Sequence, residues 1–187
     1  MNNTDLLNFV FELGQLRRIK HEGWRVIGIE NPESVAEHTL RAAQIGFILA
    51  KMEKYPYPDR VCTMVVFHDI GEARVGDIHK IAKRYIQVAE AQATQEQLEP
   101  LAKLGDEIFD LWNQVENQNT PAGILAKDAD MLEQAVMAKE YLEKGYVGAQ
   151  RWIDNISKAL QTESAKELLS TLETVNSYDW CLKLQSM

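Results

Sequence analysis

Cysteine is scarce in this sequence, with only Cys62 and Cys181 among 187 residues. Cys62 lies inside an apolar segment, where a thiol is expected to be buried and unpaired. A disulfide framework or a cysteine-based metal site requires several cysteines at suitable spacings. The scarcity therefore excludes both, and it favours a reduced, cytoplasmic protein.

A basic leader, a long apolar run and an excess of positive charge are also missing. The first residues, MNNTDLLNFVFELG, lack the basic and then apolar regions of a signal peptide. No apolar run approaches the roughly 20 residues that span a membrane. With 28 acidic against 20 basic side chains, the formal net charge is −8. Because affinity for long nucleic acids and anionic membranes comes from basic patches, we expect neither as a partner. A small anionic substrate held by a local cluster is compatible with this charge.

The sequence shows no internal repeat, convincing strand, glycine-rich phosphate loop, serine nucleophile elbow or zinc-finger spacing. Apolar residues instead recur every three to four positions, which indicates amphipathic helices. The chain is long enough, and at 45% hydrophobic residues apolar enough, to bury a substantial core. We therefore predict an all-α fold: one single-domain bundle of about eight helices, with a motif-bearing core at 5–145 and C-terminal helices in 146–187 packed on it. The expected helical segments are 4–19, a helix beginning at 35, 61–77, 90–116, 122–144, 148–161 and 163–185.

The most informative stretch is 61–77, VCTMVVFHDIGEARVGD, in which an apolar helix runs into two polar residues. Asp69 near the end of such a helix faces the negative end of the helix dipole and is desolvated, so it needs a cationic partner. The neighbouring His68 makes a divalent metal ion the simplest partner, because imidazole and carboxylate are both ordinary ligands. If the helix continues past Gly71, Glu72 lies on the same face as His68 and Asp69.

Two other predicted helices carry polar residues on apolar surfaces. Ser34 and Glu37 form a capping-box pattern, and the helix that follows places His38 on its apolar stripe. Taken alone, His38 suits a buried imidazole bonded to a carbonyl; it is also a possible ligand. The segment 122–144 contains Asp128 and Asp130, which point about 200° apart, so only one can face a given site. Together, three helices can bring two imidazoles and two carboxylates to one divalent ion.

The loop and helix ends hold residues with more than one interpretation. The spacing of Trp24, within the loop 20–33, favours a core position over a stacking surface for a base. Arg18, at the end of the first helix, is typical of a solvated helix terminus. Asp77 either caps the next helix or faces the site near Glu72.

Three motifs resemble those of the HD-domain metal-dependent phosphohydrolases, most of all the branch that contains the 5′-deoxynucleotidases. They are ENPESVAEH ending at His38, HDIGE followed by GDI over 68–78, and LAKDADMLEQA around Asp130. The resemblance implies that one divalent metal ion, of cobalt, manganese, zinc, iron, nickel or magnesium, is bound by four residues. The implied ligands are His38, His68, Asp69 and Asp130, so the resemblance selects Asp130 over Asp128.

The resemblance also implies roles around the metal. Glu72 would assist proton transfer, Asp77 would hold the nucleotide or the attacking water, and Trp24 would contact the nucleotide. In one respect this sequence differs from the nucleotidases, which have a phosphate-binding arginine directly before that tryptophan. Gly23 stands there instead. The candidates to replace it are Arg18, His21 and Arg25.

The implied activity is the hydrolysis of nucleoside 5′-monophosphates, chiefly deoxynucleotides, to nucleoside and phosphate. One alternative is hydrolysis of another phosphomonoester or of a phosphodiester, since the arginine is missing. The other is a non-catalytic protein that binds a nucleotide and a structural metal. The expected partner is a small nucleotide, and the resemblance further implies a homodimer.

Overall fold

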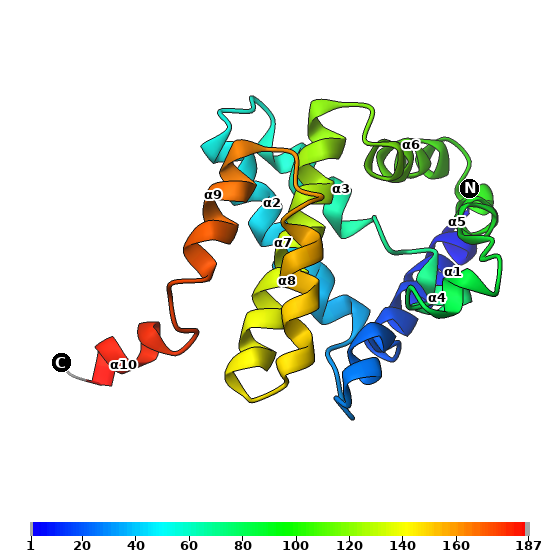
Figure 1. Cartoon of the computed structure of the whole chain (residues 1–187). Coiled ribbons are helices and arrows are strands. Elements are labelled where there is room, and N and C mark those ends of the chain that lie inside the picture. The colour runs from blue at the N-terminus through cyan, green and yellow to red at the C-terminus, as the bar shows by residue number, and fades with distance from the viewer. Residues whose placement is uncertain (1, 186–187) are drawn as a thin grey trace.

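The computed structural model describes residues 2–185, and within them it contains ten α-helices and five short 3-10 helices (Figure 1). No β-strand occurs in this part of the chain, where a single bridge pairs Lys20 with Ser34. The predicted all-α fold is therefore confirmed. The α-helices are α1 Asn3–Leu13, α2 Val35–Met52, α3 Pro58–Val66, α4 Glu72–Val75, α5 Glu90–Leu98, α6 Lys103–Asn117, α7 Pro121–Glu143, α8 Gln150–Ile156, α9 Glu163–Leu172 and α10 Asp179–Gln185. The 3-10 helices are η1 Gly14–Arg17, η2 Glu22–Ile27, η3 Ala82–Arg84, η4 Glu99–Leu101 and η5 Val147–Ala149.

Helix α7 forms the centre of the bundle and is enclosed by α2, α3, α6, α8 and α9 (Figure 1). Its small side chains let these neighbours approach closely, as Ala126, Ala129 and Ala135 have no exposed surface. Helices α8 and α9 add apolar residues such as Ile153 and Leu169 to the same core. A continuous core thus surrounds the helix that carries Asp128 and Asp130.

The starts of α2 and α7 follow from their sequences. The Ser34 side chain accepts a hydrogen bond from the Glu37 backbone N–H, and the Ser34 backbone N–H donates one to the Glu37 carboxylate, so the predicted capping box is present. At the start of α7, the Thr120 side chain accepts a hydrogen bond from the Gly123 backbone N–H, and Pro121 lies in the first turn. Both helices are therefore fixed in register at their N-termini, and so are the polar residues that they carry.

Three predicted helices are each divided in two. The sequence leaves open whether the helix that begins near Val61 continues past Gly71; in the structure α3 ends at Val66, and a turn over 67–71 precedes α4. Segment 90–116 breaks at η4, which contains Pro100, and at Ala102, whose φ of 52° is left-handed. Segment 163–185 breaks before α10, where Glu143 binds the Ser177 backbone and hydroxyl. Local hydrogen bonds at these breaks outweigh the continuous apolar pattern.

The turn over 67–71 connects the main core to a smaller apolar cluster. Helices α1, α5 and α6 contribute Phe9, Leu98 and Ile108 to this cluster, and Ile70 from the turn packs among them. A side chain at Gly71 would clash with Thr94 and crowd Glu90 on α5, so glycine permits the close approach of the turn to that helix. Within residues 2–185, no helix has the length and apolar character needed to cross a bilayer.

Candidate metal centre

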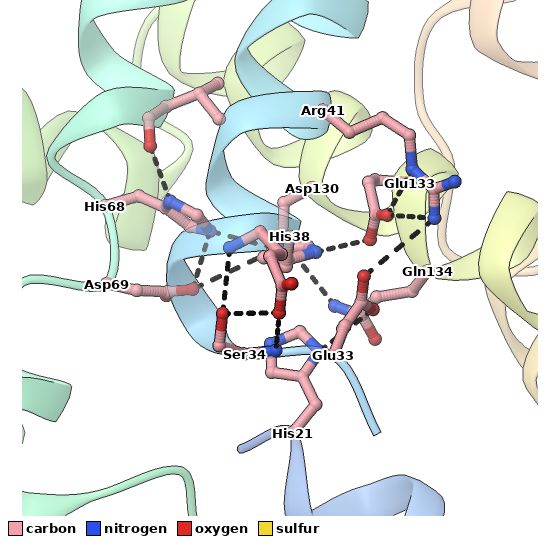
Figure 2. A network of polar contacts seen from close by, with 12 residues as sticks. His21, Glu33, Ser34, His38, Arg41, His68, Asp69, Asp130, Glu133 and Gln134 are labelled. Atoms are coloured by element: carbon pink, nitrogen blue, oxygen red, sulfur yellow. Dashed lines mark hydrogen bonds and ion pairs between the residues drawn. The ribbon is translucent and has the colours of Figure 1, made fainter. Parts of the chain in front are cut away.

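Three separate parts of the chain meet at one buried point (Figure 2). His38 comes from the first turns of α2, Asp130 from the middle of α7, and His68 with Asp69 from the turn after α3. His38 Nε2 lies 3.2 Å from Asp130 Oδ1 and 3.9 Å from Asp69 Oδ2. His68 Nε2 lies 3.0 Å from Asp69 Oδ2 and 3.8 Å from Asp130 Oδ1. The structure therefore brings all four predicted ligands together.

Both imidazoles present the same nitrogen to this point. The Nδ1 atom of His68 bonds to the Val65 carbonyl at 2.7 Å, and Nδ1 of His38 contacts the Glu133 carboxylate. The two Nε2 atoms are buried and make no hydrogen bond to the described residues. With Nδ1 protonated, each Nε2 lone pair faces the two carboxylates, which is the ligand arrangement that a divalent metal ion requires. The donor set of two imidazoles and two carboxylates fits such an ion.

Without a cation between them, the two imidazoles carry protons and the two carboxylates stay ionised. Burial lowers the pKa of His68, but the Asp69 and Asp130 carboxylates outweigh burial and raise it to about 10. Burial raises the pKa of Asp69, but the His68 imidazolium outweighs it and lowers that pKa to about 2. The pKa of His38 is likewise raised well above its usual value, because Asp130 and Glu133 outweigh its burial. A bound dication would take over the neutralising role of these protons and release them.

Asp128 has a structural role elsewhere. It has no exposed surface. Its carboxylate accepts hydrogen bonds from the backbone N–H groups of Gln161 and Thr162, at 3.1 Å and 2.6 Å, and from the Thr162 hydroxyl at 2.7 Å. Asp128 therefore fixes the segment that leads into α9, on the side of α7 opposite Asp130. The geometry agrees with the choice of Asp130 that the resemblance implies.

Glu72 lies beside the four convergent residues, at the start of α4. It is only 8% exposed, and its Oε2 atom is buried with no hydrogen-bond partner among the described residues. One oxygen each from Asp69, Glu72 and Glu90 lie within 4.8 Å of one another. Burial, followed by the charges of Asp69, Asp77 and Glu90, raises the pKa of Glu72 to about 10. In the metal-free protein, Glu72 is therefore a carboxylic acid that holds its proton.

Asp77 follows α4 and fastens the loop beside it. Its Oδ2 atom accepts a hydrogen bond from the Glu22 backbone N–H at 2.7 Å, at the start of η2. This bond joins segments 55 residues apart and holds η2 close to α4. One carboxylate oxygen of Asp77 is thus used by the fold. The role of Asp77 toward a substrate stays a prediction.

The residues predicted to bind substrate lie in different surroundings. Trp24 is 2% exposed, stacks on Trp152 with ring centroids 4.6 Å apart and meets the edge of Tyr141. The structure therefore places Trp24 in the core, as its spacing alone indicates. That position leaves almost no ring surface for the nucleotide contact that the resemblance implies. Arg18 and Arg25 are both exposed, and their side chains contact Gln15 and Glu22 of their own segments.

Of the three candidates to replace the missing arginine, His21 is the one that lies at the centre. Its ring centroid is 4.4 Å from that of His38. A nitrogen of each of these histidines and an oxygen of Asp69 lie within 4.8 Å of one another. His21 also approaches Glu33, with Nδ1 and Oε1 3.5 Å apart. His21 therefore borders the space in front of the predicted ligands.

The sequence interpretation did not identify two charged residues of α7 at the centre. Lys127 Nζ lies 2.8 Å from Asp130 Oδ2, and Glu133 contacts His38. Both are three residues from Asp130, so they share its face of the helix. That spacing is the signal by which the sequence could have revealed them once Asp130 was chosen.

Comparisons with known proteins show which family the chain resembles in sequence and in fold. The HD domain family model covers residues 13–173. The 5′-deoxynucleotidase HDDC2 of Dictyostelium discoideum is 36% identical over 148 residues, which are 74% of this chain and 78% of that protein. A conserved hypothetical protein from Pyrococcus furiosus superposes with a TM-score of 0.77 at 26% identity, over 90% of this chain and 99% of the other.

A more distant structure has the same fold. The HD phosphohydrolase DatZ of cyanophage S-2L, solved with dA and one catalytic Zn²⁺ ion, superposes with a TM-score of 0.58 at 18% identity, over 88% of this chain and 96% of the other. The family match covers most of the sequence and includes every residue of the centre. The chain therefore belongs to the HD domain family, and it is a phosphohydrolase, as the motifs at His38, His68 and Asp130 predict.

Proposed function

We propose that this protein hydrolyses deoxynucleoside 5′-monophosphates to deoxynucleosides and phosphate at the centre described above. The observation that carries the proposal is the pair of buried Nε2 atoms, on His38 and His68, which both face the Asp69 and Asp130 carboxylates across one point. The relative from Dictyostelium discoideum is named a 5′-deoxynucleotidase, and this name supports the substrate class. The dA in the phage enzyme supports a deoxynucleoside as the product.

In this proposal, four residues hold one divalent ion: His38, His68, Asp69 and Asp130. When bound, the ion supplies a Lewis acid for the phosphoryl oxygens and lowers the pKa of a water molecule. The mixed nitrogen and oxygen donors suit zinc, manganese, cobalt, iron or nickel, with magnesium less well matched to two imidazoles. The Zn²⁺ in the phage enzyme supports a transition metal.

Glu72 is the proposed acid–base group. One of its carboxylate oxygens lies within 4.8 Å of one from Asp69, so a proton on Glu72 can pass to the leaving 5′-oxygen, or an ionised Glu72 can accept one from the attacking water. We propose that the free oxygen of Asp77 orients the water or the sugar, while its other oxygen keeps η2 in place. Trp24 then acts by supporting η2 from the core.

Lys127 and His21 are the proposed contacts for the phosphate, in place of the arginine missing at Gly23. Lys127 Nζ contacts the predicted ligand Asp130 directly, and the lysine side chain is 28% exposed. An ammonium at that distance can bond a phosphate oxygen while it remains beside Asp130. Arg18 and Arg25 are less suited, because they are exposed and bonded within their own segments.

Replacing Lys127 with methionine should weaken substrate binding and leave the metal bound. A charged hydrogen bond is worth about 1.5–3 kcal/mol, so KM should rise roughly 10- to 100-fold. The Asp130 carboxylate would lose a competing cation, so metal affinity should stay equal or increase. Steady-state kinetics and a metal titration on the same preparation measure both. Arg25→Met is the matched control and should change KM little; equal effects of the two variants would contradict the assignment.

The function is tested by a phosphate-release screen. Metal-stripped protein is supplied with each divalent ion in turn and with all common ribo- and deoxynucleoside 5′-monophosphates. We expect release from deoxynucleotides with at least one transition metal and none without metal. Release from a different phosphomonoester or a phosphodiester alone would favour the alternative that the missing arginine suggests. Tight nucleotide binding with no release under any ion would contradict the proposal.

Three further predictions remain proposals: the cellular location, the oligomeric state and the number of domains. The free cysteines favour a reducing, cytoplasmic location. The family resemblance favours a homodimer, which light scattering can test. The shared core of α2, α7, α8 and α9 supports one domain, and its predicted bounds of 1–187 stay a prediction.

A further inference from the structure

A buried carboxylate stands directly behind one of the proposed metal ligands. Glu133 has no exposed surface, and its Oε2 atom contacts His38 Nδ1 (Figure 2). Glu133 lies one turn after Asp130 on α7, so successive turns of one helix reach both nitrogens of His38. A buried carboxylate costs several kcal/mol unless it is paired, so a specific partner is required.

Arg41 provides that pairing from the opposite helix. It lies one turn after His38 on α2, and its Nε and Nη2 atoms lie 2.7 Å and 2.6 Å from Glu133 Oε1. Its Nη1 atom bonds Glu140 Oε1 at 2.7 Å. The planar guanidinium therefore holds both Glu133 and Glu140 in fixed positions. As a result, two residues of α2, His38 and Arg41, contact two residues of α7, Asp130 and Glu133.

The two proposed histidine ligands differ in what fixes them. His68 donates from Nδ1 to a neutral backbone carbonyl, that of Val65. His38 faces a carboxylate instead, and a charged acceptor both fixes the ring tautomer and makes Nε2 a stronger base. The contact between α2 and α7 does not depend on this pairing alone, because apolar side chains of both helices pack in the same core.

We propose that Glu133, held by Arg41, is a positioning residue that sets the tautomer and ring orientation of His38 and thereby the metal affinity of the centre. This inference rests on the proposed metal site and adds two residues to it. Glu133 touches neither substrate nor metal. Its effect is transmitted entirely through the imidazole.

The test is Glu133→Gln, which keeps the size of the side chain and removes its charge. Outer-shell partners of this kind are worth about 10- to 100-fold in metal affinity, so the dissociation constant for Co²⁺ should rise by about that factor. Visible absorption of Co²⁺ added to metal-stripped protein gives the constant. The ¹⁵N shifts of the His38 ring, recorded without metal, should move, because Nδ1 loses its carboxylate partner.

Asp128→Asn is the matched control, since Asp128 is also a fully buried carboxylate of α7. It should lower the free energy of unfolding and leave Co²⁺ affinity and the His38 shifts unchanged. If Glu133→Gln is too unstable to purify, Arg41→Lys replaces it, because lysine keeps the charge and loses the two-pronged contact; affinity should again fall. Unchanged affinity, or a loss equal to that of Asp128→Asn, overturns the proposal. Both readouts are independent of turnover, so a protein that binds Co²⁺ in this way and releases no phosphate would disprove only the proposed function.

Discussion

Asp69→Ala is expected to abolish phosphate release without unfolding the protein. Asp69 lies 3.0 Å from His68 Nε2 and 3.9 Å from His38 Nε2, so it faces both imidazoles. Its loss removes a negative ligand and with it the bound ion. Metal catalysis is worth several kcal/mol, so turnover should fall by roughly 10³-fold or more. Phosphate release at saturating metal, together with the bound metal per chain, measures the change.

The fold should survive this substitution because Asp69 contributes no apolar packing. Its side chain is 19% exposed and lies in a turn, whereas the adjoining Ile70 supplies the packing. Circular dichroism of metal-stripped wild type and variant should therefore nearly coincide, while chemical denaturation should show the loss of the ion pair with His68. Turnover retained within a few-fold of wild type would exclude Asp69 from the reaction.

Glu72→Gln should cause the second largest loss of turnover, and the metal should remain bound. General acid–base catalysis contributes about 10²- to 10⁴-fold, so kcat should fall within that range. Glutamine keeps the shape of the buried side chain but cannot exchange a proton. The Co²⁺ affinity should change much less than in Asp69→Ala. A normal kcat would contradict the assigned role, and a proportional loss of metal would make Glu72 a ligand.

The same variant has a predicted effect on stability. Burial and the charges of Asp69, Asp77 and Glu90 raise the pKa of Glu72 to about 10 in the folded, metal-free protein, against an ordinary value of 4.5. Between these values the folded state binds more protons than the unfolded state, so this group makes stability fall as the pH rises. Glu72→Gln removes that dependence. Denaturation of metal-stripped protein at pH 6 and pH 9 should show a smaller difference for the variant than for wild type.

The sequence was sufficient for the helical fold and for the convergent residues, because periodicity and end signals are local. Val35, His38 and Ala42 lie on one stripe of α2 whatever surrounds them. The sequence was insufficient where residues far away along the chain determine the position of a side chain. Spacing could not choose between Asp128 and Asp130, since the partners of Asp128 are Gln161 and Thr162, more than 30 residues away.

Two other differences have a similar physical origin. The sequence could not say whether the helix before His68 continues past Gly71; it ends at Val66, and the turn at 67–71 packs Ile70 into a second cluster that only the folded chain forms. Trp24 was assigned to the core by its own spacing and to the substrate by the resemblance. Its stacking on Trp152, which lies 128 residues further on, gives the core position.

The central claim is that one divalent ion joins α2, α7 and the turn after α3. The most direct measurement is anomalous diffraction at the metal absorption edge, on crystals of the metal-stripped protein soaked in Co²⁺ or Mn²⁺. The account predicts a peak within coordination distance of His38 Nε2, His68 Nε2 and oxygens of both Asp69 and Asp130. A peak elsewhere, or none at concentrations that support phosphate release, would contradict it.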